Sequence, residues 1–258
     1  MMLIFAAIGL RFLRPQLMFS LFAATSALQI GVYAYSAHIV KTITRCEQPN
    51  PEILVRLNRL LDELMKEVGR MRRPSLWVSR SMEVPNAFAF GRGFGTSSHV
   101  AVTQPLLDLL DDRELKAVLG HELGHLRSYD VATMTLVSVL IGFMSRIAQQ
   151  AFRIGKMGIA VSFLLEVILY LPRIVASGIS QLREFAADAH AALITGETES
   201  LINAFRKFET WYKEHPDEIK KKTIRGAVVD ELLLSHPDME QRIQFLNELS
   251  LPCHQETP

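Results

Sequence analysis

The sequence predicts a mostly helical α+β fold that contains a small, edge-accessible sheet and is combined with transmembrane helices. Apolar residues recur at helical spacing in several otherwise polar segments. Three short runs of strand-like composition lie between these segments. Long stretches almost free of charge interrupt the pattern, although charged residues make up 21% of the 258 positions. We therefore predict four parts: an N-terminal membrane segment (1–44), a first globular part (45–130), a transmembrane hairpin (131–179) and a second globular part (180–258).

The first membrane span is predicted at 16–40. Its twenty-five positions contain no Asp, Glu, Lys or Arg, which is enough length for one helix across a bilayer. More basic residues follow this stretch than precede it, so the positive-inside rule favours a cytoplasmic location for the residues after it. The two cysteines show no pairing framework and suit a reducing compartment.

A helix is predicted to begin after Asn50, because Asn is a favoured N-cap and Pro51 suits the first helical position. Gly69 can end this helix. Its apolar stripe has helical spacing: Ile53, Leu54, Leu57, Leu61, Leu64 and Val68. The strand-like runs come next, at Ser75–Ser79, Asn86–Phe90 and His99–Thr103.

Asn86–Phe90 is the predicted edge of the small sheet. An open edge can accept an extended peptide as an additional strand. The alternative is that Phe88 and Phe90 are core aromatics, which would give this run a purely structural role.

The most specific motif in the chain is His121-Glu122-Leu123-Gly124-His125. Residues four apart lie one turn apart on a helix, so the two imidazoles point the same way and can share one tetrahedral zinc ion. Glu122 lies beside the metal rather than on it, where it can take a proton from water. Asp111 as N-cap, with Glu114 three residues later, predicts a helix through the motif. This pattern is typical of a zinc hydrolase; the alternative is two surface histidines on an amphipathic helix.

A hydrolytic zinc usually has three protein ligands, so another ligand is needed. Glu184 and Asp188 lie four apart in an Ala-rich segment with helical character. The flanking Phe and Ala residues indicate burial, and buried carboxylates need partners. One carboxylate can bind the metal, while the other can accept the free N–H of a ligating histidine. His190 and Asp130 are weaker candidates for the ligand.

The stretch 131–179 is predicted to be a transmembrane hairpin. Val131–Ala151 and Met157–Ile179 are each long enough to cross a bilayer, and two crossings return the chain to the side of the motif. Arg146 and Glu166 each lie fifteen residues from the same membrane face, so we expect them to pair. The alternatives are that both reach the far interface, or that the stretch forms two buried helices of a soluble bundle.

The C-terminal part is predicted to form helices at Glu199–Lys213 and Asp238–Leu249. His236 lies near the start of the second helix, and Arg242 follows six residues later. Near a zinc site, such a histidine could stabilise the oxyanion of a tetrahedral intermediate. The net charge is only +1, without interleaved basic and aromatic residues, so we expect no nucleic-acid partner.

In this order, the motifs resemble those of the HtpX-type membrane zinc metalloproteases, which are related to the CAAX prenyl proteases. The matching segments are Pro85–Ala89, His121–His125, Val131–Leu136, Arg183–Asp188, and His236-Pro237 with Arg242. The chain departs from the family in two respects. Members usually begin with two membrane helices, whereas one full span is found here, and the segment after the predicted hairpin is compact.

This resemblance implies a zincin-like catalytic domain of the gluzincin type. One zinc ion per chain would be bound by His121, His125 and Glu184. Glu122 would be the general base, and Asp188 would orient a ligating histidine.

The resemblance also implies that the strand Asn86-Ala87-Phe88 holds the substrate backbone and that His236 and Arg242 face the scissile carbonyl. Family members cleave misfolded or membrane proteins from the cytoplasmic side of the bacterial inner membrane, in quality control under stress. We therefore expect a multi-pass membrane endopeptidase with protein substrates. The alternatives are a membrane scaffold or holdase without catalysis, and a specific processing protease of the prenyl-protein type.

Overall fold

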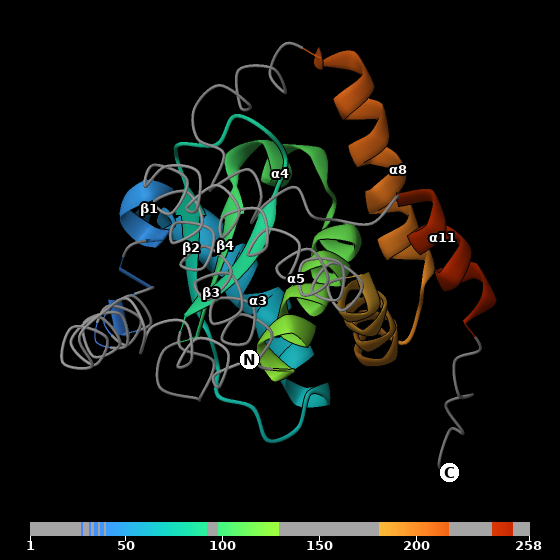
Figure 1. The fold of residues 1–258 in the computed structure, drawn as a ribbon, viewed down its shortest axis with the longest axis horizontal. Helices are drawn as coiled ribbons and strands as arrows, with labels where there is room; N and C mark the ends of the chain where they lie inside the picture. The colour runs from blue at the N-terminus through green and yellow to red at the C-terminus, as the bar shows by residue number, and fades with distance from the viewer. Residues whose placement is uncertain are drawn as a thin grey trace, which may run out of the picture.

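The computed structural model describes residues 40–91, 98–128, 181–216 and 239–249, together with 27, 31, 34, 35, 37 and 38. These residues form helices around one small sheet, which confirms that part of the predicted fold class (Figure 1). The elements are β1 (Cys46–Glu47), α3 (Pro51–Glu67), β2 (Ser75–Ser79), β3 (Ala87–Gly91), β4 (Ser98–Thr103), α4 (Gln104–Leu109), α5 (Asp112–Arg127), a helix at 181–195, α8 (Glu199–Glu214) and α11 (Met239–Glu248).

Within these described ranges, no helix combines the length and the apolar character needed to cross a bilayer. Most of the predicted span 16–40 lies outside the described residues, as does the whole predicted hairpin 131–179 with Arg146 and Glu166. The transmembrane helices therefore stay a prediction.

The sheet is mixed, with the strand order β1-β2-β4-β3. β2 and β4 run parallel, with Ser75 opposite His99, whereas β1 and β3 run antiparallel to their neighbours. In the described part of the chain, β3 pairs with β4 alone, so the predicted edge strand is confirmed. It spans Ala87–Gly91 rather than Asn86–Phe90, a shift of one residue.

Helix α3 begins and ends as the sequence predicts. The Asn50 side chain accepts a hydrogen bond from the Ile53 backbone N–H at 2.8 Å, and Pro51 occupies the first turn. Gly69 follows the helix with a φ of +76°, in the left-handed region that favours glycine. The apolar stripe packs into the core through fully buried leucines: Leu57, Leu61 and Leu64. Leu54, which the sequence placed in the same stripe, is exposed instead.

Helix α5 packs beside α3 on the same face of the sheet and lies at the centre of the molecule (Figure 1). The predicted capping box is present at its start. Asp111 accepts hydrogen bonds from the N–H groups of Arg113 and Glu114, and the Glu114 carboxylate accepts one from the Asp111 N–H. The whole His121–His125 motif is buried in the third and fourth turns of this helix.

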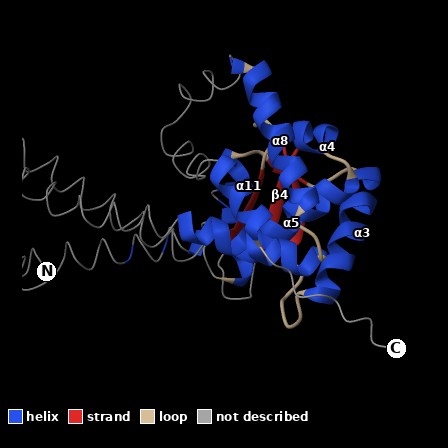
Figure 2. Cartoon of the chain, turned by 90° about the vertical axis from the view of Figure 1, so that its right-hand side faces the viewer, coloured by secondary structure: helices blue, strands red, loops and turns tan. Residues whose placement is uncertain are grey.

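Three helices lie beside α5 in Figures 1 and 2: the 181–195 helix, α8 and α11. The 181–195 helix and α8 pack against α5, and α11 packs against α8. Two glycines of α5 allow the first of these to approach closely. A Cβ atom on Gly124 would lie only 3.0 Å from the Cα atom of Ala187, and one on Gly120 would lie 3.4 Å from the Cα atom of Ala191. The missing side chains therefore bring the backbone that carries Glu184 next to the histidine motif.

Candidate metal centre and active site

Two imidazole rings from α5 form one side of the site. His121 and His125 lie one turn apart, and their Nε2 atoms are 3.1 Å from each other. The rings are nearly perpendicular, at 89°, and both residues are buried. The two nitrogen atoms therefore face a common point inside the protein.

Glu184 reaches this point from the 181–195 helix. One of its carboxylate oxygens lies 3.4 Å from Nε2 of His121, and the other lies 3.4 Å from Nε2 of His125. Among the residues that the structure describes, this trio is the group that could hold a metal ion. A tetrahedral zinc ion with bonds of about 2.0–2.2 Å separates its ligand atoms by about 3.3–3.6 Å. The two imidazole–carboxylate separations of 3.4 Å fall within this range, and the 3.1 Å between the two Nε2 atoms lies slightly below it. Two imidazoles and a carboxylate at this spacing therefore suit zinc.

Asp188 lies one turn after Glu184 and contacts the opposite edge of the His121 ring. Its Oδ1 atom is 2.8 Å from Nδ1 of His121, and the carboxylate is fully buried. Burial by itself raises the pKa of Asp188, but hydrogen bonds from Arg242 and His121 outweigh it and lower the pKa below its usual value. The ionised carboxylate favours the tautomer of His121 with its proton on Nδ1, which leaves Nε2 free to bind a metal.

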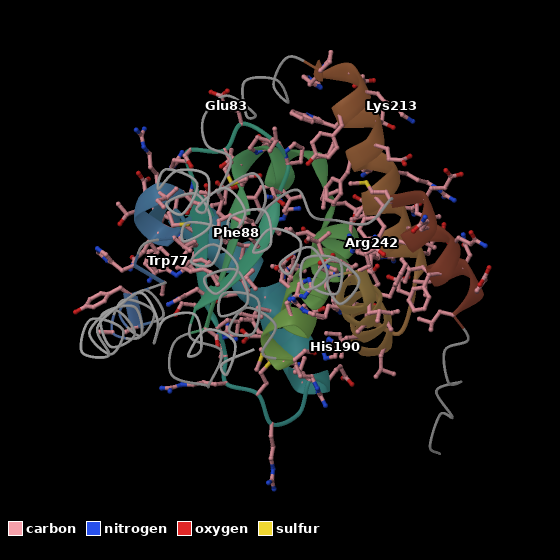
Figure 3. The ribbon with its side chains drawn as sticks, in the orientation of Figure 1. Trp77, Glu83, Phe88, His190, Lys213 and Arg242 are labelled. Atoms are coloured by element: carbon pink, nitrogen blue, oxygen red, sulfur yellow. The ribbon has the colours of Figure 1, made fainter. Side chains whose placement is uncertain are left out.

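Arg242, on α11, joins the two carboxylates. Its Nε and Nη2 atoms donate to the two oxygens of Asp188 at 2.7 and 2.5 Å, and its Nη1 atom lies 3.3 Å from Oε2 of Glu184. The guanidinium lies over the ring of Phe205, 4.2 Å from the ring centroid. Figure 3 shows Arg242 in the space between α5 and α11. The sequence singled out this arginine, but its pairing with Asp188 was not predicted.

We expect Arg242→Met to lower the free energy of unfolding by about 3 kcal/mol, because it removes the partner of a fully buried carboxylate. For a chain of this size, that change corresponds to a fall in Tm of about 6–12 °C, measured by calorimetry. The matched control is Arg206→Met on the exposed side of α8, which should change stability by no more than about 0.5 kcal/mol. Equal Tm values for the two variants would contradict this account of the ion pair.

Glu122 is buried next to this network and lines a cavity between β3, α5 and α8. Asn86 and Ala87 line the same cavity, so the structure brings the predicted base together with part of the predicted substrate strand. Phe88 is not among the described lining residues. Its ring packs against Phe90, and Figure 3 shows it on the sheet, well away from Arg242.

The weaker ligand candidates do not join the metal group within the described residues. His190 lies on the same helix as Glu184, but its Nδ1 atom is 3.4 Å from the backbone oxygen of Gly120, and Figure 3 shows it apart from Arg242. Asp130 and His236 lie outside the described residues.

The open edge of β3 borders the same cavity. The backbone of Asn86 faces β4, because its oxygen accepts from the Thr103 N–H at 3.0 Å and its N–H donates to the Thr103 hydroxyl at 2.9 Å. Backbone groups of successive residues in an extended strand point to opposite sides. The N–H and C=O groups of Ala87 therefore point away from β4, where a further strand could pair with them.

Comparisons with known proteins agree with this geometry. The family model described as peptidase family M48 matches residues 54–250. The chain is 32% identical over 248 residues to a protease HtpX homolog of Aquifex aeolicus (strain VF5), covering 87% of this chain and 81% of that protein. It is 31% identical over 240 residues to a protease HtpX homolog of Kineococcus radiotolerans, covering 84% of this chain and 79% of that protein.

A solved structure has a similar fold. The crystal structure of S. mikatae Ste24p matches with a TM-score of 0.54 at 20% sequence identity. The match covers 95% of this chain but 61% of that chain, so this chain spans less than two thirds of its length. At this level of identity, the likeness concerns the fold alone.

Proposed function

Since the chain belongs to peptidase family M48 and is a metalloprotease, we propose that it is a membrane-anchored, zinc-dependent endopeptidase. The proposed substrates are peptide bonds of misfolded or membrane proteins. The observation that carries the proposal is the trio of His121, His125 and Glu184, whose potential ligand atoms converge within 4.8 Å of one another inside the protein.

In this proposal, the trio holds one zinc ion per chain. Two imidazoles and a carboxylate suit zinc, and three protein ligands leave a fourth position open for substrate chemistry. When bound there, zinc would polarise a peptide carbonyl and lower the pKa of water. Asp188 would keep His121 in the tautomer that binds metal, and Arg242 would hold Asp188 and Glu184 in place.

Glu122 is the proposed general base. It follows His121 on α5 and lines the cavity at the site, so it is near the metal group without belonging to it. Its carboxylate would take a proton from the attacking water and deliver it to the leaving amine. His236, together with the cavity-lining Arg242, is proposed to stabilise the negative charge that develops on the carbonyl oxygen.

The substrate strand is proposed to pair with the open edge of β3. The outward N–H and C=O groups of Ala87 would form the hydrogen bonds of that pairing, between the flanking Asn86 and Phe88. This arrangement would place an extended peptide along the cavity that Glu122 lines. An extended, unfolded segment is therefore the form of substrate that the site would accept.

Membrane anchoring is proposed from the sequence. The stretches 16–40 and 131–179 carry the apolar length of one span and of a hairpin. In this arrangement, the hairpin divides the catalytic unit into parts at 45–130 and 180–258, and both parts lie on the cytoplasmic side. The relatives named protease HtpX homolog support the protease part of this proposal.

The proposal is tested by incubating the purified full-length protein, in detergent, with an unfolded protein substrate. We expect cleavage that stops when a chelator removes the metal and returns when zinc is added, because the proposed hydrolysis needs a metal at the trio to polarise the peptide carbonyl and activate water. A zinc-loaded protein that cleaves no unfolded or membrane protein would contradict the proposal and favour a scaffold or holdase.

A further inference from the structure

The chain passes from the end of the predicted first span into the sheet without a flexible linker. Residues 40–43 are helical, and β1 begins only two residues later, at Cys46. The hydroxyl and the N–H of Thr44 both donate to the backbone oxygen of Val40, at 2.6 and 2.9 Å, and so close the helix. Arg45 has a φ of +46°, in the left-handed region that a residue with a side chain adopts only where its surroundings enforce it. The turn between the helix and the sheet therefore has one defined shape.

Two side-chain contacts and one strand pairing fix this turn to β2. The Ser79 hydroxyl donates to the backbone oxygen of Thr44 at 2.8 Å, in buried surroundings. The Lys41 ammonium lies over the Trp77 ring, 3.8 Å from the ring centroid, in a cation–π contact. β1 pairs with the end of the same strand, with Cys46 opposite Ser79. We call residues 41–47, together with Trp77 and Ser79, the span–sheet junction.

A row of rings continues from the junction across the sheet to the edge strand. The Nε1–H group of Trp77 donates to Nδ1 of His99 on β4 at 3.2 Å. Burial, together with the nearby charge of Lys41, lowers the pKa of His99 to about 4, so the ring is uncharged at neutral pH and can accept this bond. The His99 ring stacks on that of Phe90 in β3, with centroids 5.0 Å apart.

The sheet therefore holds its open edge at a fixed distance from the junction. The strand order β1-β2-β4-β3 places β3 three strand spacings, or about 14 Å, from β1. Every step across this distance is bridged by strand pairing, and the ring contacts join β2, β4 and β3 as well.

Two exposed apolar side chains lie next to the junction. Tyr35 is 66% exposed and Ile43 is 54% exposed, although both are large. Tyrosine is enriched where a membrane helix meets water, and the basic Lys41 directly follows the charge-free stretch 16–40. These residues place the junction at the membrane surface in the proposed arrangement.

From these contacts, and on the basis of the proposed function with its membrane anchoring, we propose that the span–sheet junction sets how far from the bilayer the enzyme cuts a membrane-anchored substrate. The junction keeps the edge of β3, which borders the cavity that Glu122 lines, at one height above the bilayer. A peptide tethered by its own span reaches this edge only over a narrow range of distances from that span. A soluble unfolded chain is not tethered, so the junction does not limit its cleavage. Lys41, Trp77 and Ser79 are thus positioning residues that do not touch the substrate.

The test uses a substrate with one membrane span and a long unfolded tail made of identical short repeats. The full-length protein and the substrate share vesicles of phosphatidylethanolamine and phosphatidylglycerol, and mass spectrometry of the early products gives the cleavage positions along the tail. We expect the wild-type protein to cut within a narrow window. A Gly-Ser-Gly-Ser insertion between Thr44 and Arg45 adds a reach of about 11 Å, or about three extended residues, and should widen the window by that amount. The matched control is the same insertion between Gly69 and Arg70, which are both exposed, and it should keep the wild-type window.

Cleavage of a soluble unfolded protein is measured beside it, and both insertion variants should retain the wild-type kcat/KM. If the insertion after Thr44 lowers this value, the double variant Lys41→Met, Ser79→Ala decides, because it removes two contacts of the junction at unchanged chain length. Its window should also be wider than that of the wild type.

The outcomes separate this inference from the proposed function. A wild-type protein that cuts the tail evenly, or a window that these variants leave unchanged, would overturn the role of the junction while the protease stands. Cleavage of the soluble protein without any cleavage of the tethered tail would do the same. If the zinc-loaded wild type cleaves neither substrate, the proposed function fails, and the role of the junction fails with it.

Discussion

Glu122→Gln is expected to lower kcat at least about 1,000-fold while zinc stays bound. Glutamine keeps the size of glutamate but cannot accept a proton from water. The metal should remain because Glu122 is not part of the trio whose atoms converge on the metal position. Both quantities can be measured on one sample, as turnover of an unfolded protein and as zinc per chain by mass spectrometry.

The matched control for this variant is Glu67→Gln. Glu67 is exposed at the end of α3 and is not among the described residues that line the cavity. It should retain wild-type turnover. If Glu122→Gln kept turnover within about tenfold of the wild type, Glu122 would not be the base. Loss of zinc together with activity would instead indicate that Glu122 supports the metal ligands.

Glu184→Ala is expected to weaken zinc binding by more than about 100-fold. Loss of a residue that only hydrogen-bonds to a metal ligand already lowers metal affinity by about 10–100-fold, and Glu184 is itself a proposed ligand. The substitution removes the carboxylate that lies 3.4 Å from each Nε2 atom, and only two imidazoles remain from the trio. Competition with a chromophoric chelator measures the affinity directly. Activity should fall with zinc occupancy and should recover in part at high zinc concentration.

The comparison variant is Glu199→Ala, which removes an exposed carboxylate from the first turn of α8. It should bind zinc as tightly as the wild-type protein. A fully zinc-loaded Glu184→Ala protein would point to another third ligand, for which His190 and Asp130 are the candidates. A Tm measurement on each variant excludes global unfolding as the cause of metal loss.

Local signals predicted the helices that carry the site. Asp111 with Glu114 marked the start of α5, and Asn50 with Pro51 marked the start of α3, because capping depends on residues only a few positions apart. The same reasoning missed β1, which has only two residues. It also missed α4, although Thr103 is a favourable N-cap residue type and its side chain does cap this helix.

Contacts between distant segments could not be predicted from such signals. The Arg242–Asp188 pair joins residues 54 positions apart, and nothing in the spacing shows which carboxylate the guanidinium meets. The close approach of α5 to the 181–195 helix did leave a signal, since Gly120 and Gly124 lie one turn apart opposite an Ala-rich helix. The predicted membrane segments and His236 stay predictions, because they lie largely outside the described residues.

The most direct test of the metal centre is zinc K-edge X-ray absorption on the purified full-length protein. The account predicts about one zinc per chain, with nitrogen and oxygen ligands at about 2.0–2.2 Å and the multiple-scattering pattern of two imidazoles. A sulfur ligand near 2.3 Å, or only one imidazole, would contradict the assignment of His121, His125 and Glu184 as the ligands.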